Sequence, residues 1–332
     1  MKIKLRILCT WSLILALKSQ ADVGELQITL KVANDSGIPV AGATVGVSCV
    51  QSKAPLAVIT AQNVGQKQID VVTDTNGLGV IRVPDVVDQH IWYGINPLPG
   101  YYYTSGGELK LERVRNGQWQ PWNQTVDVVL KPIGVGVPMY AKKVSWKTSI
   151  PENNKPIGYD LEIGDWVAPY GKGITSDLMF TLERHFTSVT QDFNATLKLT
   201  FPNDGDGIQS VRSDSSGSAL RIPRLAPENG YESKLVLQMY REGGKPIVGV
   251  LADTDQNYFF RVRTKRDDRG NIVSVRYGKI QGGIGWDIFH SPTAQIQFTY
   301  YLNSKPNSRN TEFDPQGNQF KNLPPLERAT AP

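Results

Sequence analysis

Histidines and carboxylates are the residues of this 332-residue chain that could perform acid–base chemistry. Glu183 and His185 alternate in a predicted strand, so both side chains share one face, where they could act as an acid–base pair. Glu162 and Asp165 lie in an acidic stretch before that strand, and glycosidases use such paired carboxylates. A solvent-exposed strand edge would explain the alternation of Glu183 and His185, and a charged loop would explain the acidic stretch, without any catalytic role. These four residues are the candidate catalytic residues of a hydrolase.

Motifs that would define an enzyme class are incomplete. The three histidines show no H-E-x-x-H spacing, and no serine stands in a G-x-S-x-G turn. Residues 171–173 resemble part of a phosphate-binding loop, but glycine follows the lysine and Trp166 replaces the upstream glycine. We therefore expect no cofactor, and a non-catalytic protein is favoured over an enzyme.

One acidic loop resembles the start of a calcium-binding loop. Asp253, Asp255 and Asn257 place oxygen ligands at alternate positions. Tyr258 stands where such a loop needs glycine, and Thr264 stands where it needs a bidentate glutamate. The three residues are candidate calcium ligands, but the incomplete pattern predicts no metal site.

Aromatic residues gather in loop-rich stretches and suggest a binding surface. Flat exposed rings stack on sugar faces or anchor a protein partner. The same rings could instead fill a sandwich core. The candidate ligand-binding residues are Tyr102, Trp119, Trp122, Trp166, Tyr170 and Trp286.

Residues 1–21 are typical of a signal peptide. Lys2, Lys4 and Arg6 precede an apolar run that is too short to span a bilayer, and Ser19 and Ala21 are small residues of the type that a signal peptidase reads. Cleavage would export the protein to the periplasm, the cell surface or the exterior. No later apolar run reaches membrane length, so we expect no membrane partner after cleavage.

The basic excess belongs largely to this leader. The whole chain has 36 Lys and Arg against 31 Asp and Glu. Without the four basic residues of the leader, 32 basic and 31 acidic residues remain. A near-neutral mature chain carries no electrostatic signature of nucleic-acid binding. Cys49 is then the lone cysteine, so no intramolecular disulfide is expected.

Alternation of apolar and polar residues predicts an all-β protein. Leu26, Ile28 and Leu30 share one face of a half-buried strand. Turn residues follow at 34–37, and Asn76-Gly77 is a strong tight-turn dipeptide between further strands. No stretch has the period of an amphipathic helix.

Three motifs of this region resemble the carboxypeptidase regulatory-like domain, a transthyretin-like β-sandwich found on many exported bacterial proteins. They are DSGIPVAGATV at 35–45, TDTNGLG at 73–79 and PGY at 99–101, and the resemblance covers about a third of the chain. It implies an Ig-like sandwich that acts as a spacer, folding or interaction module, with no catalytic residues to transfer. The aromatic-rich segment at 85–122 departs from the family pattern.

Strand-like runs continue beyond residue 139 and predict a second β-sandwich or jelly roll. Apolar and polar residues alternate at 197–201, 235–239 and 296–300, and residues 260–277 read as a hairpin. The predicted organisation is a signal peptide at 1–21, a regulatory-like sandwich at 22–132, a linker at 133–139, a second all-β domain of unrecognised type at 140–303 and a disordered tail at 304–332.

These features favour an exported, non-catalytic binding or structural protein of the bacterial cell envelope. A carbohydrate or an envelope protein would be its partner. Two alternatives stay open: a secreted hydrolase with an acid–base site in the second domain, and a surface subunit that assembles with copies of itself. The ligand and the oligomeric state are undecided at this stage.

Overall fold

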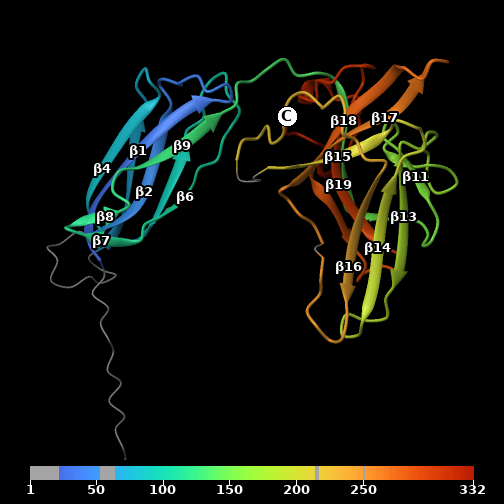
Figure 1. Ribbon diagram of the computed structural model, residues 1–332, viewed down its shortest axis with the longest axis horizontal. Coiled ribbons are helices and arrows are strands. Elements are labelled where there is room, and N and C mark those ends of the chain that lie inside the picture. Colours follow the sequence, from blue (N-terminus) through green and yellow to red (C-terminus); the bar gives the residue numbers. More distant parts are fainter. Residues whose placement is uncertain (1–21, 53–63, 214–216, 250) are drawn as a thin grey trace, which may run out of the picture. The chain divides into compact units, whose positions relative to one another are not determined.

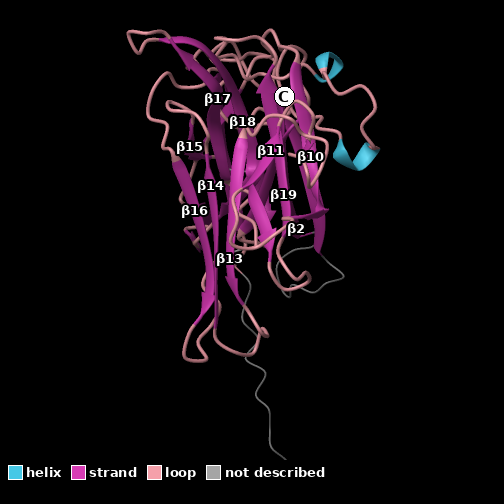
Figure 2. Cartoon of the chain, turned by 90° about the vertical axis from the view of Figure 1, so that its right-hand side faces the viewer, coloured by secondary structure: helices cyan, strands magenta, loops and turns pink. Residues whose placement is uncertain are grey.

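The computed structural model describes residues 22–52, 64–213, 217–249 and 251–332, and it is built almost entirely of β-strands (Figures 1 and 2). This confirms the predicted all-β class. The predicted signal peptide lies outside the described residues. Within them, no helix is long and apolar enough to cross a membrane. The chain divides into two compact units, Met1–Asn96 with Gly106–Val128 and Pro97–Ser105 with Val129–Pro332.

The first unit is a β-structure whose strands pair in the order β6-β5-β2-β4-β1-β8-β7, with β3 attached to β2 and β9 to β1. Because β2 and β4 pair only at Gln51 and Val86, the strands form two parts that share one core. The alternating residues of β1 point into that core, where Ile28 and Val47 are buried. The strands are β1 (Gly24–Asn34), β2 (Thr44–Ser52), β3 (Val64–Val72), β4 (Leu78–Val86), β5 (His90–Ile95), β6 (Gly107–Lys110), β7 (Arg113–Arg115), β8 (Gln118–Gln120) and β9 (Gln124–Leu130).

The two turn motifs of this unit lie side by side. The backbone N–H of Val32 donates to the carbonyl of Gly77, and the hydroxyl of Thr73 donates to the carbonyl of Val40 at 2.7 Å. Gly77 has a φ of +72°, and a Cβ there would lie 2.2 Å from the carbonyl oxygen of Val32. Only glycine fits this turn, so the Asn76-Gly77 pair fixes how the two motifs meet.

The second unit is a sandwich of two five-stranded antiparallel sheets. The β18 sheet has the order β10-β19-β18-β17-β15, and the β14 sheet has the order β12-β11-β13-β14-β16. Phe180 and Leu197 of one sheet and Phe260 and Phe298 of the other meet in the core between them. The strands are β10 (Met139–Ser149), β11 (Ile157–Asp160), β12 (Asp165–Trp166), β13 (Leu178–His185), β14 (Phe193–Thr200), β15 (Gly207–Arg212), β16 (Lys234–Arg241), β17 (Gln256–Arg266), β18 (Ile272–Asp287) and β19 (Gln295–Asn303).

The segment 304–332 is packed and hydrogen-bonded, contrary to the disordered tail that its polar, proline-rich composition predicts. Phe313 is buried against Tyr301 of β19, with the ring centroids 5.3 Å apart. Met139, Ala141 and Ala329 complete this small core on the outer face of the β18 sheet. The segment includes the 3-10 helices η1 (Pro315–Gly317) and η2 (Pro325–Glu327). A few apolar residues therefore order it, because β10 and β19 leave matching apolar residues uncovered.

The boundary between the two units also differs from the predicted linker at 133–139. The backbone N–H of Gly134 donates to the buried Glu312 carboxylate at 2.7 Å, and that of Val137 donates to the Glu312 carbonyl. Residues 97–105, predicted as part of the first domain, belong to the second unit, where Thr104 pairs with Ser218. Glycine-rich composition suggested a free connection, but hydrogen bonds to the C-terminal segment hold these residues.

Candidate functional site

A partly buried cluster of charges links the end of β11 in one sheet to β17 in the other. The guanidinium of Arg263 on β17 donates to Asp177 at 2.7 and 2.9 Å and to Asp160 at 3.3 Å. Glu162 lies 2.6 Å from the same guanidinium and 2.9 Å from that of Arg276. Every member of the cluster thus has a partner of opposite charge, which is the arrangement that makes buried charge tolerable.

Hydrogen bonds from the backbone explain why these carboxylates are buried. Asp160 accepts from the N–H groups of Glu162, Ile163, Ile174 and Thr175. Burial alone would raise the pKa of Asp160, but these N–H donors outweigh it and lower the pKa. The cluster fastens the loops around β12 to the sandwich, so its chemistry is structural.

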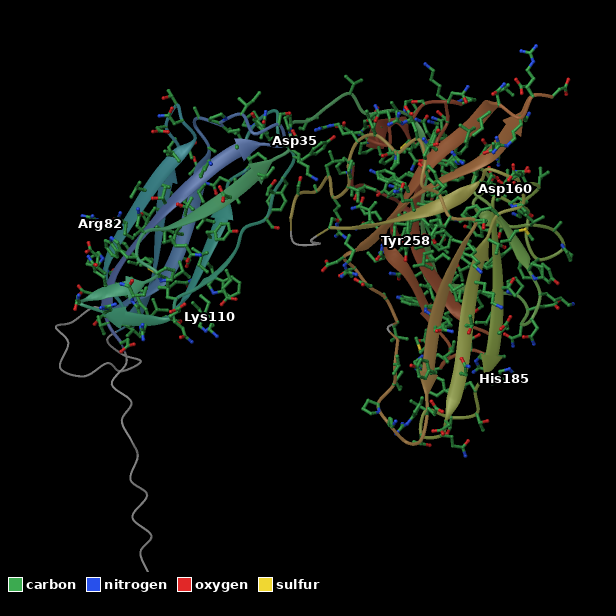
Figure 3. The ribbon with its side chains drawn as sticks, viewed as in Figure 1. Asp35, Arg82, Lys110, Asp160, His185 and Tyr258 are labelled. Carbon is green, nitrogen blue, oxygen red and sulfur yellow. The ribbon has the colours of Figure 1, made fainter. Side chains whose placement is uncertain are left out.

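The four candidate catalytic residues do not come together. Glu183 and His185 do share the outer face of β13, as predicted. Figure 3 shows His185 at the far end of this strand from Asp160, and Asp160 pairs with Asp165 of β12 and is followed closely by Glu162. The strand separates the two pairs by roughly 20 Å at about 3.3 Å per residue. No single cleft contains both pairs, so they cannot act on one substrate bond.

Each candidate catalytic residue also has a local environment of its own, either an ion pair, a backbone hydrogen bond or a surface depression. Glu183 binds Lys198 at 2.5 Å, and Glu162 belongs to the charge cluster described above. Asp165 accepts from the backbone N–H of Lys172 at 3.0 Å and lines a depression of about 390 Å³. His185 lines a different depression of about 420 Å³.

Three of the six candidate aromatic residues are core residues, which corrects their predicted role in ligand binding. Trp166 and Trp286 are buried in the core between the two sheets of the second unit. Trp119 is buried in the first unit, where its indole N–H donates to the carbonyl of Val86 at 2.9 Å. The sequence did not show this because long-range strand pairing, rather than local composition, decides which rings are covered.

The other three candidate aromatics are partly exposed but scattered. The Tyr102 hydroxyl donates to the buried Glu312, so it fastens the start of the second unit to the C-terminal segment. The Tyr170 hydroxyl donates to Glu152 at 2.5 Å, and Trp122 lies 6.0 Å from the guanidinium of Arg82. Trp122 thus belongs to the first unit and Tyr102 and Tyr170 to the second, and each ring contacts a charged partner of its own.

The oxygen atoms of two candidate calcium ligands, Asp253 and Asn257, form an ion pair or hydrogen bonds with other groups of the protein. Asp253 binds Arg212 at 2.7 Å, and its other oxygen accepts from the backbone N–H of Asp255. Asn257 is fully buried, and its side-chain oxygen accepts from the backbone N–H of Gly282. Among the described residues, no group of three His, Cys, Asp or Glu side chains could hold a metal ion.

The outer edge of β16 is a feature that the sequence analysis did not single out. Tyr240 exchanges hydrogen bonds with Val248 on the side away from β14, so alternate residues of β16 direct their backbone groups outward. Val236 shares this orientation, and its outward N–H and C=O groups have no hydrogen-bond partner among the described residues. Gly249 covers the outward side of Gln238, because a Cβ on Gly249 would lie 2.3 Å from the carbonyl oxygen of Gln238. The first half of β16, around Val236, therefore offers an unpaired sheet edge.

Apolar side chains accompany this edge. Val236 is 42% exposed and Val248 is 50% exposed, and Tyr240 is also exposed. Tyr240 and Val248 are cross-strand partners, and Val236 lies on the same face four residues before Tyr240. Edge strands usually carry charges, prolines or bulges that prevent pairing. The segment Lys234 to Gln238 has one charge, at its start, and no proline.

Comparisons with known proteins find no matching family model and no matching curated protein. Among solved structures, the shaft pilin SpaA from Lactobacillus rhamnosus GG is 13% identical over 33% of this chain and 48% of its own, with a TM-score of 0.23. The major pilin SpaD from Corynebacterium diphtheriae is 13% identical over 78% of this chain and 60% of its own, with a TM-score of 0.23. The 3-chlorocatechol 1,2-dioxygenase from Rhodococcus opacus 1CP is 14% identical over 34% of this chain and 62% of its own, with a TM-score of 0.24.

The alignment thus spans about half the length of the shaft pilin and less than two thirds of the other two proteins. At these TM-scores the likenesses carry no conclusion about the fold or the activity of this chain.

Proposed function

We propose that this chain is an exported, non-catalytic structural subunit that pairs with a second copy of itself along β16. The observation that carries the proposal is the unpaired edge at Lys234 and Val236, where the Val236 side chain is exposed. An unpaired edge is a template for another strand, because each outward N–H and C=O group gains a partner on pairing.

A second copy fits this edge by symmetry. Two copies related by a two-fold axis through Val236 would place Val236 opposite Val236 and Lys234 opposite Gln238, from which Gly249 would move on pairing. No like charges would then face each other, and apolar side chains would meet at the centre. The pairing would extend the β14 sheet of one copy into that of the other.

Export and the role of the first unit belong to the same proposal. Residues 1–21 have the pattern of a cleaved leader, and the motifs at 35–45 and 73–79 resemble those of regulatory-like sandwiches. We propose that the first unit acts as a spacer module at the bacterial cell envelope. Mass spectrometry of the exported chain would support this proposal by finding an N-terminus at Asp22 and would contradict it by finding residues 1–21 retained.

Light scattering after size-exclusion chromatography tests the pairing. The chain from residue 22 should elute as a dimer at high concentration, and Val236→Lys should be monomeric because two ammonium groups would face each other. Val273→Lys is the matched control, since Val273 is 52% exposed on another strand, and this variant should remain dimeric. A monomeric parent chain, or a Val236→Lys variant that still dimerises, would refute the proposal.

A further inference from the structure

The outer face of the first unit carries a side-chain pattern that strand pairing along β16 does not use. The register of β3, β2, β5 and β6 places one row across all four strands: Gln68, Ser48, Trp92 and Glu108. Residues directly opposite each other in neighbouring strands share a face, so these side chains lie on one side of the sheet. The buried Val47 and Ile91 of the same strands occupy the other side.

Trp92 stands out in this row because it is 57% exposed. It is the only tryptophan of the described residues that belongs to the exposed class. Its strand, β5, is paired on both sides, by β2 and by β6, so the backbone under the indole is held by the sheet. An exposed indole on a fixed backbone provides a flat apolar surface at low entropic cost on binding.

The backbone beside the ring is uncovered, and we call this open space over Gly94 the glycine hollow. Gly94 follows Trp92 on the same face, and its cross-strand partner is Gly46. A Cβ added at Gly94 would meet no atom within 4 Å, so the space above it is open. A Cβ at Gly46 would lie 2.7 Å from Oδ1 of Asp70, so that carboxylate leans over Gly46 and borders the hollow.

Hydrogen-bonding groups surround the ring and the hollow. The side-chain amide of Gln68 donates to Asp70 at 3.4 Å, and that of Gln66 donates to the Ser48 hydroxyl at 2.8 Å. On the other side of Trp92, Glu108 contacts the imidazole of His90. Amides, a hydroxyl and carboxylates together supply both donors and acceptors.

We propose that this surface, the Trp92 face, binds a neutral oligosaccharide. A sugar ring has an apolar C–H side that can stack on an indole and a rim of hydroxyl groups that both donate and accept hydrogen bonds, as the groups on this face do. One sugar ring would stack on Trp92, and the glycine hollow leaves room for the next ring of the same oligosaccharide.

The charges and the apolar area of the face favour this occupant over others. Glu108 lies directly opposite Trp92, and Asp70 borders the glycine hollow, so an anionic polymer would meet a carboxylate on each side of this face. Lys110 also lies on this face, opposite His90, which contacts Glu108. A protein interface would need a larger apolar centre than one indole among polar side chains.

Isothermal titration and intrinsic fluorescence of the chain from residue 22 test the proposal. The probes are neutral hexasaccharides of glucose, N-acetylglucosamine, mannose and galactose, with polygalacturonate as the anionic comparison. At least one neutral hexasaccharide should bind and shift the tryptophan emission to shorter wavelength. Trp92→Ala and Gly94→Val should each weaken this binding by about tenfold or more, because they remove the platform or fill the hollow.

Two features of the design separate a binding defect from a folding defect. Gly94→Val adds a β-branched side chain to a strand position with open space, so its circular dichroism and Tm should match the parent. Val80→Ala, at an exposed position on β4, is the matched control and should bind like the parent. The proposal is overturned if no neutral hexasaccharide binds, if polygalacturonate binds instead, or if both face variants bind unchanged. Val236→Lys should bind the sugar normally, so failure of the dimer and failure of this site are distinguishable.

Discussion

Arg263 supplies the positive charge for two carboxylates that are withdrawn from water. Its replacement by methionine would leave Asp177 and Asp160 buried without their countercharge. We expect Arg263→Met to lower the free energy of unfolding by about 3–5 kcal/mol in urea denaturation. Arg266→Met is the matched control, because Arg266 pairs with the exposed Asp204 and should change stability by less than about 1 kcal/mol. Equal effects of the two substitutions would contradict a structural role for the cluster.

Lys279 makes the stability of the second unit depend on pH. Burial lowers the pKa of this lysine to about 7, although Glu312 opposes the shift and Lys131 adds to it. The Nζ atom donates to a backbone oxygen of Pro332 at 2.8 Å and lies 4.9 Å from the ring of Tyr301. The unfolded chain therefore binds a proton more tightly than the folded chain between pH 7 and the ordinary pKa of lysine.

Stability should consequently rise with pH over this window, by up to about 1.4 kcal/mol per pH unit from this residue. Urea denaturation at pH 7, 8 and 9 measures the slope. Lys279→Met should flatten it, whereas Lys305→Met, at an exposed position, should leave it unchanged. A slope that survives the loss of Lys279 would show that another group carries it.

Residue roles were the part of the structure that the sequence predicted least well. Glu183 and His185 do share a strand face, but no local pattern could show that Asp165 and Glu162 lie at the other end of that strand. Trp92 had a usable signal, since the alternation of Ile91 and Ile95 with their neighbours places its ring on the outer face.

At the scale of elements, the segment 304–332 is the largest difference between expectation and structure. Phe313→Ala should lower the free energy of unfolding by about 3–5 kcal/mol, because Phe313 is buried against Tyr301. Leu326→Ala, at a 73% exposed position of the same segment, should have little effect. Thermal or urea unfolding measures both, and a Phe313→Ala variant as stable as its parent would indicate a disordered tail after all.

Alternation predicted β1, β14, β16, the β17–β18 hairpin and β19, because one face of each strand is apolar and period two is visible locally. It could not predict which strands would be edges. Glu232 pairs with Ile208 of β15, but no described strand covers the outward side of β16 at Val236. This long-range arrangement leaves no mark in either sequence run.

At the scale of the whole molecule, the two proposed surfaces lie on different compact units. Changes on one should therefore leave the other intact. Trp92→Ala should dimerise like the parent in light scattering, and a monomeric Trp92→Ala variant would show that the Trp92 face takes part in assembly. The separation suits a subunit that builds an assembly with one sandwich and presents a binding face on the other.

Charge complementation at Val236 tests the pairing of two copies most directly. Val236→Lys and Val236→Asp each place like charges opposite one another in a symmetric pair, so each variant alone should be monomeric by light scattering. An equal mixture should form a heterodimer, because lysine then faces aspartate across the two-fold axis. A mixture that stays monomeric, or either variant dimerising alone, would contradict assembly through β16.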